Sequence, residues 1–203
     1  IADPFRPGHE KSYFPGETNF RRADVIVVNK ANNAKKEDVD TVVANAAEMN
    51  PKADVILGSS TVIISDPEAL KGKKVMIIED GPTLTHGGMA IGAGFVAAQK
   101  YEAGEIIDPR PYVSGSLKTI FEKFTQLGKV LPAMGYYDEQ IKELESAISK
   151  APVDIILVGT PIDLSRVVKF DKPVVRVTYK LEDMGDSSLS DNIMAFLKEH
   201  KLI

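Results

Sequence analysis

Short apolar runs that alternate with amphipathic segments constrain the fold of this chain more than any other feature. The runs within 23–28, 54–57, 74–78 and 154–158 have the length and composition of buried strands. Residues 36–49 instead place Val39, Val42, Val43 and Ala46 on one helical face. Strands that alternate with helices are typical of a mostly parallel sheet. The pattern therefore predicts an α/β fold with a doubly wound, three-layer sheet of the Rossmann-like or P-loop NTPase-like kind.

Shorter segments predict the remaining elements. They comprise helices at 89–102, 116–126 and 188–199, a helix that begins at Asp138, and strands at 105–107, 129–132 and 173–179. Leu189, Ile193, Phe196 and Leu197 are expected to be the buried face of the last helix. Turn signals at Asp66-Pro67 and Lys71-Gly72 make 61–73 a connector. We expect two domains, residues 1–70 and 71–203.

Composition excludes several classes of protein. With 27% charged residues and a net charge of -4, the chain lacks the basic surface that nucleic-acid binding requires. No run approaches the roughly 18 apolar residues of a membrane span. The absence of cysteine excludes disulfides, thiolate metal sites and cysteine catalysis. We expect a cytoplasmic protein without nucleic-acid or membrane partners.

The N-terminal residues indicate missing upstream sequence. Ile1-Ala2-Asp3-Pro4 has the character of the end of a buried strand. The chain also lacks the phosphate-binding pattern G-x-x-x-x-G-K-[ST]. We therefore expect the C-terminal part of a larger nucleotide-handling enzyme, whose missing N-terminal portion carries the phosphate-binding loop. The fragment alone is expected to be inactive.

Polar residues gather where the predicted strands end. These clusters are Asp3–Glu10, Asn29–Asn32, Gly58–Ser60, Glu79–Gly88, Asp108–Pro111 and Gly159–Asp163. Ligands of open parallel sheets bind beyond the carboxyl ends of the strands. Loops favour such residues in any case, but the repetition favours one functional edge. Arg6, Arg110 and Arg166 adjoin these loops and are candidate phosphate ligands or structural ion-pair partners.

The pair Asn29-Lys30 follows an apolar strand, as in the base-recognition loop of GTPases. Asn32 stands where those proteins place an aspartate, whose two oxygens accept the guanine N–H groups. Guanine selectivity is therefore in doubt and adenine stays open. Ser59 and Ser60 end the next predicted strand, where GTPases have a small-residue loop beside the base. We predict a nucleotide-binding site of Asn29, Lys30, Asn32, Ser59 and Ser60.

The segment Glu79–Gly88 is the richest in chemistry. It places two carboxylates, two hydroxyls, one histidine and three glycines directly after a buried strand. Carboxylates suit Mg²⁺, and backbone N–H groups with hydroxyls suit phosphate oxygens. Glu79 and Asp80 are thus candidate Mg²⁺ ligands, although a solvated polar turn would have the same composition.

Six strings in this order resemble the cyclic 2,3-diphosphoglycerate synthetase family and extend over most of the chain. They are DPFRPGHE (3–10), YFPGETN (13–19), EDGPTLTHG (79–87), DPRPY (108–112), LPAMGY (131–136) and GTPIDL (159–164). The family's usual aspartate after Asn-Lys-x is Asn32 here. The resemblance implies a protein of about twice this length and an ATP-dependent ligase that closes a small bisphosphate into a cyclic phosphoanhydride.

The resemblance also implies roles for the strand-end residues. Mg²⁺ would be the cofactor, ATP or GTP the nucleotide, and a small phosphorylated molecule the substrate. The candidate catalytic residues are Asp3, Arg6, His9, Glu79, Asp80 and His86. The candidate substrate or phosphate ligands are Gly81, Thr83, Thr85, Gly87, Arg110, Gly159, Thr160 and Asp163. Assembly of the chain into a homo-oligomer stays open.

Two alternatives compete with the ligase interpretation. The run from Pro7 to Lys30 also resembles the nickel-insertion and cobalamin-chaperone GTPases, which act as metallochaperones or regulatory switches. The lack of cysteine and of a histidine-rich tract counts against that alternative. A folded interaction domain without nucleotide dependence is the second alternative.

Overall fold

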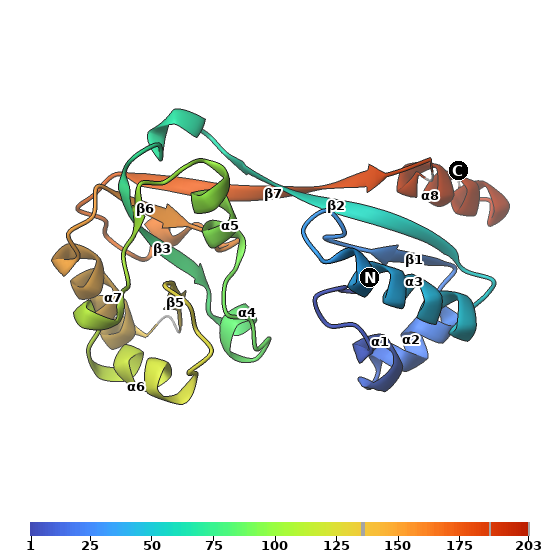
Figure 1. The fold of residues 1–203 in the computed structure, drawn as a ribbon, viewed down its shortest axis with the longest axis horizontal. Coiled ribbons are helices and arrows are strands. Elements are labelled where there is room, and N and C mark those ends of the chain that lie inside the picture. The colour runs from blue at the N-terminus through green and yellow to red at the C-terminus, as the bar shows by residue number, and fades with distance from the viewer. Residues whose placement is uncertain (135–136, 187, 203) are drawn as a thin grey trace. The chain divides into compact units, whose positions relative to one another are not determined.

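The computed structural model describes residues 1–134, 137–186 and 188–202. Gly135 and Tyr136, which end the fifth string above, lie outside the described residues. The strands are β1 (Val25–Val28), β2 (Asp54–Ile64), β3 (Lys74–Asp80), β4 (Glu105–Ile106), β5 (Leu131–Ala133), β6 (Ile155–Val158) and β7 (Val174–Met184). The sheet order is β1-β2-β7-β6-β3-β4, and β5 also pairs with β3. Figure 1 labels all of these strands except β4. The prediction of a mostly parallel α/β sheet is confirmed.

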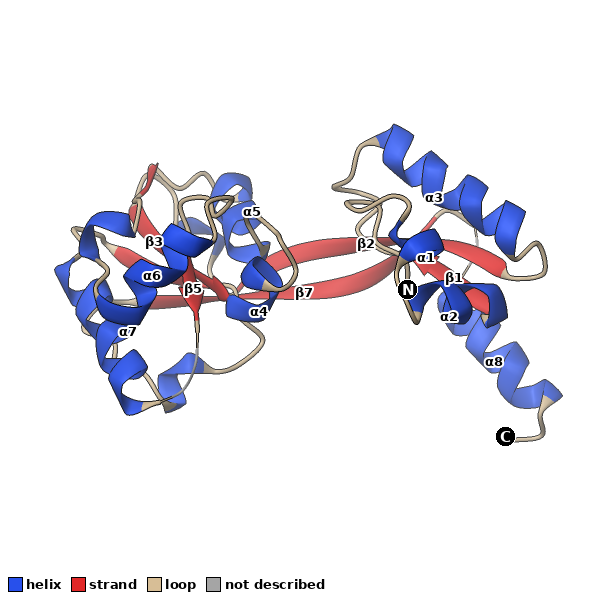
Figure 2. Ribbon diagram, turned by 90° about the horizontal axis from the view of Figure 1, so that it is seen from below, coloured by secondary structure: helices blue, strands red, loops and turns tan. Residues whose placement is uncertain are grey.

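Helices occupy most of the segments between the strands (Figure 2). The α-helices are α1 (His9–Ser12), α2 (Gly16–Arg22), α3 (Lys36–Met49), α4 (Gly81–Thr85), α5 (Ala93–Lys100), α6 (Gly115–Lys123), α7 (Asp138–Lys150) and α8 (Leu189–Glu199). Short 3-10 helices lie at Pro67–Ala69, Arg110–Tyr112 and Leu164–Arg166. None of the helices in the described ranges combines the length and the apolar character needed to cross a bilayer.

The chain forms two compact units. Unit 1 comprises Ile1–Thr61 and Lys180–Ile203, and unit 2 comprises Val62–Tyr179. Both β2 and β7 therefore have residues in each unit. The predicted division at residue 70 places the segment after Lys180 in the second domain, whereas the structure groups this segment with unit 1.

Unit 1 is built on a short parallel sheet. Val25–Val28 of β1 pair in register with Asp54–Leu57 of β2, and Ala2 bridges to Val28 in the same direction. Helix α3 buries Val42 and Ala46 in the small core that Ile26 and Val28 also form. The carboxyl ends of these strands thus come together with the residues that follow Ala2.

Unit 2 is built around β3, whose Val75–Ile78 are fully buried. β3 pairs in parallel with β4 near its start, with β5 near its end and with β6 between them. β6 in turn pairs in parallel with β7. After β3, the chain first forms β4 and β5, which pair with one edge of β3. It then forms β6, which pairs with the opposite edge of β3. This reversal of strand order places a topological switch point at the carboxyl end of β3.

Two predicted boundaries are wrong for the same reason. β2 continues through Gly58–Ser60 to Ile64, so these residues form strand where the sequence analysis expected a loop and a connector. β7 likewise continues beyond Tyr179 to Met184. The β-branched residues Thr61–Ile64 favour extended backbone, and the side chain of Thr61 bonds to that of Glu182, 121 positions away, at 3.0 Å. Such distant pairing is invisible in a local pattern.

The helices at 89–102 and 188–199 also differ from expectation. Only Ala93–Lys100 is helical in the first segment, because Gly92 has extended backbone and caps the helix. Helix α8 begins near its predicted start, but none of its residues is buried. Ile193 and Phe196, expected in a core, are 48% and 42% exposed. An amphipathic pattern specifies a helical face, and it does not specify that anything packs on that face.

Candidate active site at the carboxyl ends of the strands

The switch point of unit 2 collects residues from three parallel strands. Glu79 and Asp80 end β3, and they pair in register with Pro132 and Ala133 of β5. On the other side, the N–H of Gly159 donates to the carbonyl oxygen of Ile78 at 2.7 Å. Glu79, Asp80 and Gly159 are thereby brought to one edge of the sheet, as the sequence analysis expected for strand-end residues.

Glu79 is the central side chain of this edge, with a relative exposure of 2%. Its Oε1 accepts hydrogen bonds from the N–H groups of Phe95, at 2.9 Å, and Gly92, at 3.2 Å. These N–H groups belong to the start of α5, where helical N–H groups lack intrahelical partners and favour negative charge. The carboxylate of Glu79 therefore occupies the position in which a helix N-terminus would otherwise bind an anion.

Three glycines make room for the Glu79 carboxylate. A Cβ at Gly92 would lie 2.5 Å from Oε2 and 2.8 Å from Cδ of Glu79. A Cβ at Gly94 would meet Ile77 Cγ2 at 2.7 Å, and one at Gly159 would collide with Glu79 Oε2. Such distances are too short for real carbon contacts, so the packing requires residues without a side chain. We call Glu79, Asp80, Gly92, Gly94 and Gly159 the unit 2 rim.

Burial raises the pKa of the Glu79 carboxyl from its ordinary value of 4.5 to about 7, because the apolar surroundings disfavour its charged form. The backbone N–H groups of Phe95, Gly94 and Gly92 oppose this shift, and the neighbouring charge of Asp80 adds to it. A carboxyl with this pKa exchanges its proton near neutral pH. Perturbed groups of this kind are concentrated at functional sites.

The segment after Glu79 is a capped helical turn. Asp80 Oδ2 accepts from the backbone N–H and the hydroxyl of Thr83, at 3.1 and 2.7 Å, and so caps α4. The buried Thr85 hydroxyl donates to the Gly81 carbonyl oxygen at 2.9 Å and lies 3.2 Å from His86 Nδ1. His86 is exposed. Thr83, Thr85 and Asp80 thus have structural partners within α4, and His86 is the group that is open to solvent.

The predicted Mg²⁺ ligands Glu79 and Asp80 have hydrogen-bond partners within the chain. Glu79 is buried against backbone N–H groups, and one oxygen of Asp80 is used as a helix cap. Within residues 1–134, 137–186 and 188–202, no group of three or more His, Cys, Asp or Glu side chains could hold a metal ion. Mg²⁺ that accompanies a nucleotide is usually bound through one or two carboxylates together with waters and phosphate oxygens, so the Mg²⁺ site at Glu79 and Asp80 stays a prediction.

The other candidate ligands of unit 2 lie in different surroundings. Gly87 donates its N–H to the Pro82 carbonyl oxygen, and a Cβ at Gly81 would collide with Ala133 and Met134. Thr160 is buried directly after Gly159. Arg110 pairs with Asp108 at 2.9 Å and donates to the Leu127 carbonyl oxygen, so its guanidinium is engaged within its own loop.

The corresponding edge of unit 1 contains the predicted nucleotide-binding residues. Asn32 Oδ1 accepts from the Ser60 N–H at 2.9 Å, and the Ala31 N–H donates to the Gly58 carbonyl oxygen at 3.0 Å. These bonds hold the Asn29–Asn33 turn against β2. Ser59 contacts the hydroxyl of Thr61 at 3.0 Å. The structure thus brings together the segments that sequence reasoning associated.

Lys30 is the charged residue of this turn, with a left-handed backbone (φ 62). Its ammonium pairs with Asp3 Oδ2 at 3.1 Å and lies 5.9 Å from the ring centroid of Phe5. Asn29 Oδ1 accepts from the Lys30 N–H at 2.8 Å. We call Asp3, Asn29, Lys30, Asn32 and Ser60 the unit 1 rim. Its charged pair is partly exposed, unlike the carboxyl of Glu79.

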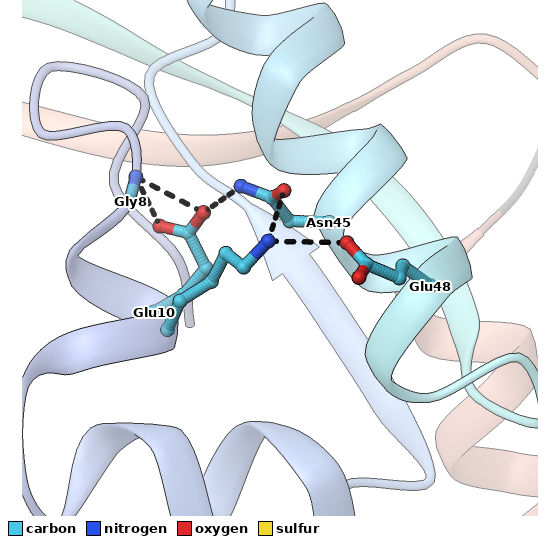
Figure 3. Close-up of polar contacts among 5 residues, drawn as sticks. Gly8, Glu10, Asn45 and Glu48 are labelled. Atoms are coloured by element: carbon cyan, nitrogen blue, oxygen red, sulfur yellow. Dashed lines mark hydrogen bonds and ion pairs between the residues drawn. The ribbon is translucent and has the colours of Figure 1, made fainter.

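The loop after Asp3 is fixed by a residue that sequence reasoning gave no role. Glu10 is 8% exposed, and its carboxylate accepts from the Gly8 N–H at 3.0 and 3.1 Å and from Asn45 Nδ2 at 2.5 Å (Figure 3). Lys11 bridges from the same turn to Glu48 at 3.1 Å. Arg6 is half-buried and His9 is exposed. Glu10 therefore anchors the loop that carries these two candidates onto α3.

Sequence reasoning also missed the partners of Glu79. Gly92 and Gly94 are both expected inside a helix. Gly94 is the second residue of α5, whereas Gly92 caps this helix, and both lie against the carboxylate. A signal was present, because two glycines in the pattern G-x-G at the opening of a helix allow close approach of another group to the backbone. The pattern did not show that the approaching group is a side chain of the chain itself.

Comparison with known proteins supplies one informative relative, and no protein-family model matches the chain. Arginine synthetase ArcE of Thermococcus kodakarensis is 50% identical to this chain over 198 residues. The match covers 98% of the chain but 44% of the relative. The chain therefore spans less than half the length of the curated relative that it matches.

This relative overturns the functional interpretation drawn from the six strings. A protein that is 50% identical to nearly the whole of this chain is named an arginine synthetase. It is named neither a cyclic 2,3-diphosphoglycerate synthetase nor a metallochaperone GTPase, so the family assignment, the cyclisation reaction and the GTPase alternative are wrong. The strings are real features of the chain, but the fold and loops that they mark do not specify the reaction.

Proposed function

We propose that this chain is part of an enzyme that synthesises arginine with ATP as the energy source. The observation that carries the proposal is the 50% identity to arginine synthetase ArcE over 98% of the chain. Because the match covers 44% of that relative, the proposal concerns the intact protein. This chain would contribute the unit 2 rim to catalysis and the unit 1 rim to nucleotide binding. Each unit would have a Rossmann-like fold.

The chemistry of the product supports a nucleotide-driven reaction. The guanidinium group of arginine is a planar cation whose carbon carries three nitrogens. Making it from a ureido or an amino precursor requires a new C–N bond at a weakly electrophilic carbon. Phosphoryl transfer from ATP can activate an oxygen on that carbon as a leaving group. The protein then contributes positioning and charge neutralisation rather than covalent chemistry.

Glu79 suits the role of general base in such a reaction. The nitrogen that attacks the activated carbon must lose a proton, and a carboxyl with a pKa of about 7 accepts protons well near neutral pH. Glu79 also lies at the switch point of the sheet, where ligands of open α/β sheets bind.

The unit 1 rim favours adenine as the nucleotide base. Asn32 stands in place of the aspartate that would accept two guanine N–H groups, and its Oδ1 already accepts from Ser60. A guanine base would therefore meet no charged acceptor at this position. Lys30, paired with Asp3, lies in the same turn. The phosphate-binding element, and the remaining ligands of the Mg²⁺ that accompanies ATP, would lie outside this chain.

The intact protein tests the proposal directly. It is incubated with ATP and Mg²⁺, and with either a ureido amino acid plus ammonium or a δ-amino amino acid plus urea, since both the ureido group and urea carry an oxygen that ATP can activate and that leaves as phosphate. We expect ATP-dependent formation of L-arginine, measured by amino-acid analysis, with one of the two precursor classes. Absence of arginine with both classes would refute the proposed function.

A matched pair of variants tests the role of Glu79. Glu79→Gln keeps the shape and the acceptor oxygen but cannot take up the proton, so kcat should fall about 10²–10⁴-fold. Glu139→Gln, at an exposed position of α7, should leave kcat unchanged. Equal turnover by Glu79→Gln and the wild type would show that Glu79 is not the general base. The proposed function would still stand.

A further inference from the structure

Unit 2 has a second candidate binding place, a pocket of about 220 Å³ beside the carboxyl end of β6. Its walls include Asp163, Leu164, Ser165, Phe170, Val174 and Arg176. This volume lies below the range of about 300–1,000 Å³ typical of pockets for drug-sized ligands. The pocket therefore fits a molecule of the size of a small metabolite.

The pocket lies on the opposite face of the sheet from Glu79. Ile78 pairs in register with Val158, and Val158 pairs with Arg176, so these three side chains share one face. Glu79 follows Ile78 and points to the other face, because successive side chains of a strand alternate. The pocket is consequently separate from the unit 2 rim.

Opposite charges stand side by side in this pocket. Asp163 Oδ2 lies 3.8 Å from Arg176 Nη1 and 3.7 Å from Arg166 Nε. Both distances exceed the usual length of a hydrogen bond, so neither arginine is hydrogen-bonded to Asp163 Oδ2. Asp163 Oδ1, in contrast, accepts from the Ser165 hydroxyl at 2.7 Å and from its N–H at 3.3 Å. The Ser165 hydroxyl bond and the nearby guanidinium groups lower the pKa of Asp163, which stays charged.

Arg176 keeps most of its hydrogen-bonding capacity. Its guanidinium carries five N–H donors, and its one hydrogen bond among the described residues is to the Pro161 carbonyl oxygen at 3.4 Å. That bond is long for an N–H donor and a carbonyl acceptor. A carboxylate ligand would therefore find free donors at Arg176, and a cationic group would find the free oxygen of Asp163.

The remaining wall of the pocket is apolar. Leu164 and Val158 are almost fully buried, Phe170 packs against the core of unit 2, and Val174 is 37% exposed. Few polar groups on an apolar wall fix the orientation of a ligand while the wall takes its hydrocarbon part. The arrangement matches a ligand with two adjacent opposite charges and an aliphatic stem.

We propose that this pocket is a binding site for a zwitterionic α-amino acid, separate from the catalytic edge. The α-carboxylate bonds to the Arg176 guanidinium, the α-ammonium bonds to Asp163 Oδ2, and the side-chain methylenes lie against Leu164 and Val174. The site does not rest on the proposed reaction, because the charges of Asp163 and Arg176 and the apolar wall of the pocket carry it by themselves.

The test uses L-norvaline, a zwitterion with a short aliphatic side chain, and the intact protein. Methyl signals of Leu164 and Val174 are followed by NMR as the ligand is added. We expect saturable shifts with L-norvaline, and at least about tenfold weaker binding of N-acetyl-L-norvaline and L-norvalinamide, each of which lacks one charge. No saturable shift, or equal binding of the three ligands, would overturn the site.

Variants identify the charge partner. Arg176→Gln should weaken L-norvaline binding at least about tenfold, because it removes a charge-assisted pair. Arg166→Gln, which contacts the same carboxylate from a largely exposed position, should change it by less than about twofold. Unchanged binding in a folded Arg176→Gln protein would contradict the proposal. If Arg176→Gln does not fold, the ligand series on the wild type decides.

A further variant separates this site from the reaction. Glu79→Gln should lose turnover and retain L-norvaline binding, because its side chain lies on the other face. Loss of binding in this variant would place the amino acid at the catalytic edge and overturn a separate site. If the wild type forms no arginine yet binds L-norvaline through Arg176, the proposed function fails and the site stands.

Discussion

The unit 1 rim and the unit 2 rim both lie at the carboxyl ends of parallel strands. Each contains a carboxylate at the end of a strand, and the two carboxylates have different surroundings. In unit 1, Asp3 pairs with the ammonium of Lys30, and both side chains are partly exposed. In unit 2, Glu79 is buried, and its hydrogen bonds among the described residues come from backbone N–H groups. Burial without a countercharge raises the pKa of Glu79 toward neutrality. The comparison teaches that the surroundings of a strand-end carboxylate, and not its place at the end of a strand, give Glu79 its raised pKa.

The largest expected effect is the pH dependence of unit 2 stability. The folded pKa of Glu79, about 7, exceeds its ordinary value of 4.5, so the folded state holds the proton more tightly than the unfolded state. Stability is therefore fully present below pH 4.5 and falls as the pH rises to about 7. The loss should be on the order of 3 kcal/mol at most, by linkage.

Glu79→Gln should remove this loss. The variant should equal the wild type near pH 5 and be more stable at pH 8, as measured by urea unfolding and by amide exchange in β3. Asp3→Asn in unit 1 is the matched control and should leave the pH profile of unit 2 unchanged. Identical profiles for Glu79→Gln and the wild type would mean that Glu79 titrates normally.

A smaller effect is expected from filling the glycine space around Glu79. Gly159→Ala would place a Cβ 2.7 Å from the Gly94 nitrogen and against the Glu79 carboxylate. Overpacking of this kind typically costs about 1–3 kcal/mol. Gly16→Ala in unit 1 is the control, because no atom lies within 4 Å of the added Cβ and the position is helical. It should be neutral or slightly stabilising, and equal urea midpoints for the two variants would contradict the close packing.

The smallest effect is expected at the ion pair of unit 1. Lys30→Met removes a partly exposed pair, which should change the free energy of unfolding by less than about 1 kcal/mol. The same variant should lower the ATP-dependent rise in the melting temperature of the intact protein. A loss of several kcal/mol in the free energy of unfolding would show that Lys30 has a structural role. An unchanged rise in melting temperature with ATP would show that Lys30 does not contribute to nucleotide binding.

Much of the fold was predictable from local pattern. The buried runs at 25–28, 74–78 and 155–158 and the helix at 36–49 lie close to where the sequence analysis placed them, because burial and periodicity are local signals. The continuation of β2 and β7 was not predictable, since it depends on pairing between residues such as Thr61 and Glu182. The exposure of α8 was also missed, because burial depends on a partner surface.

The site was predictable in its location but not in its electrostatics. Parallel strands bring their carboxyl ends together, so a cluster at Glu79 and Gly159 followed from the strand assignments. Sequence alone could not show that Glu79 bonds to the N–H groups of Gly92 and Phe95, or that burial shifts its pKa. The pairing of Lys30 with Asp3, 27 positions away, was equally hidden.

Both β2 and β7 have residues in each unit, and this affects how genes for homologous chains can be recombined. Unit 2 is one continuous segment, whereas unit 1 is encoded on both sides of it. A single crossover anywhere in the coding sequence would therefore give a chimaera whose unit 1 combines parts of two parents. Exchange of unit 2 as a whole needs two crossovers, near codons 61 and 180, and cassettes with those junctions are the natural design for moving its rim between homologues.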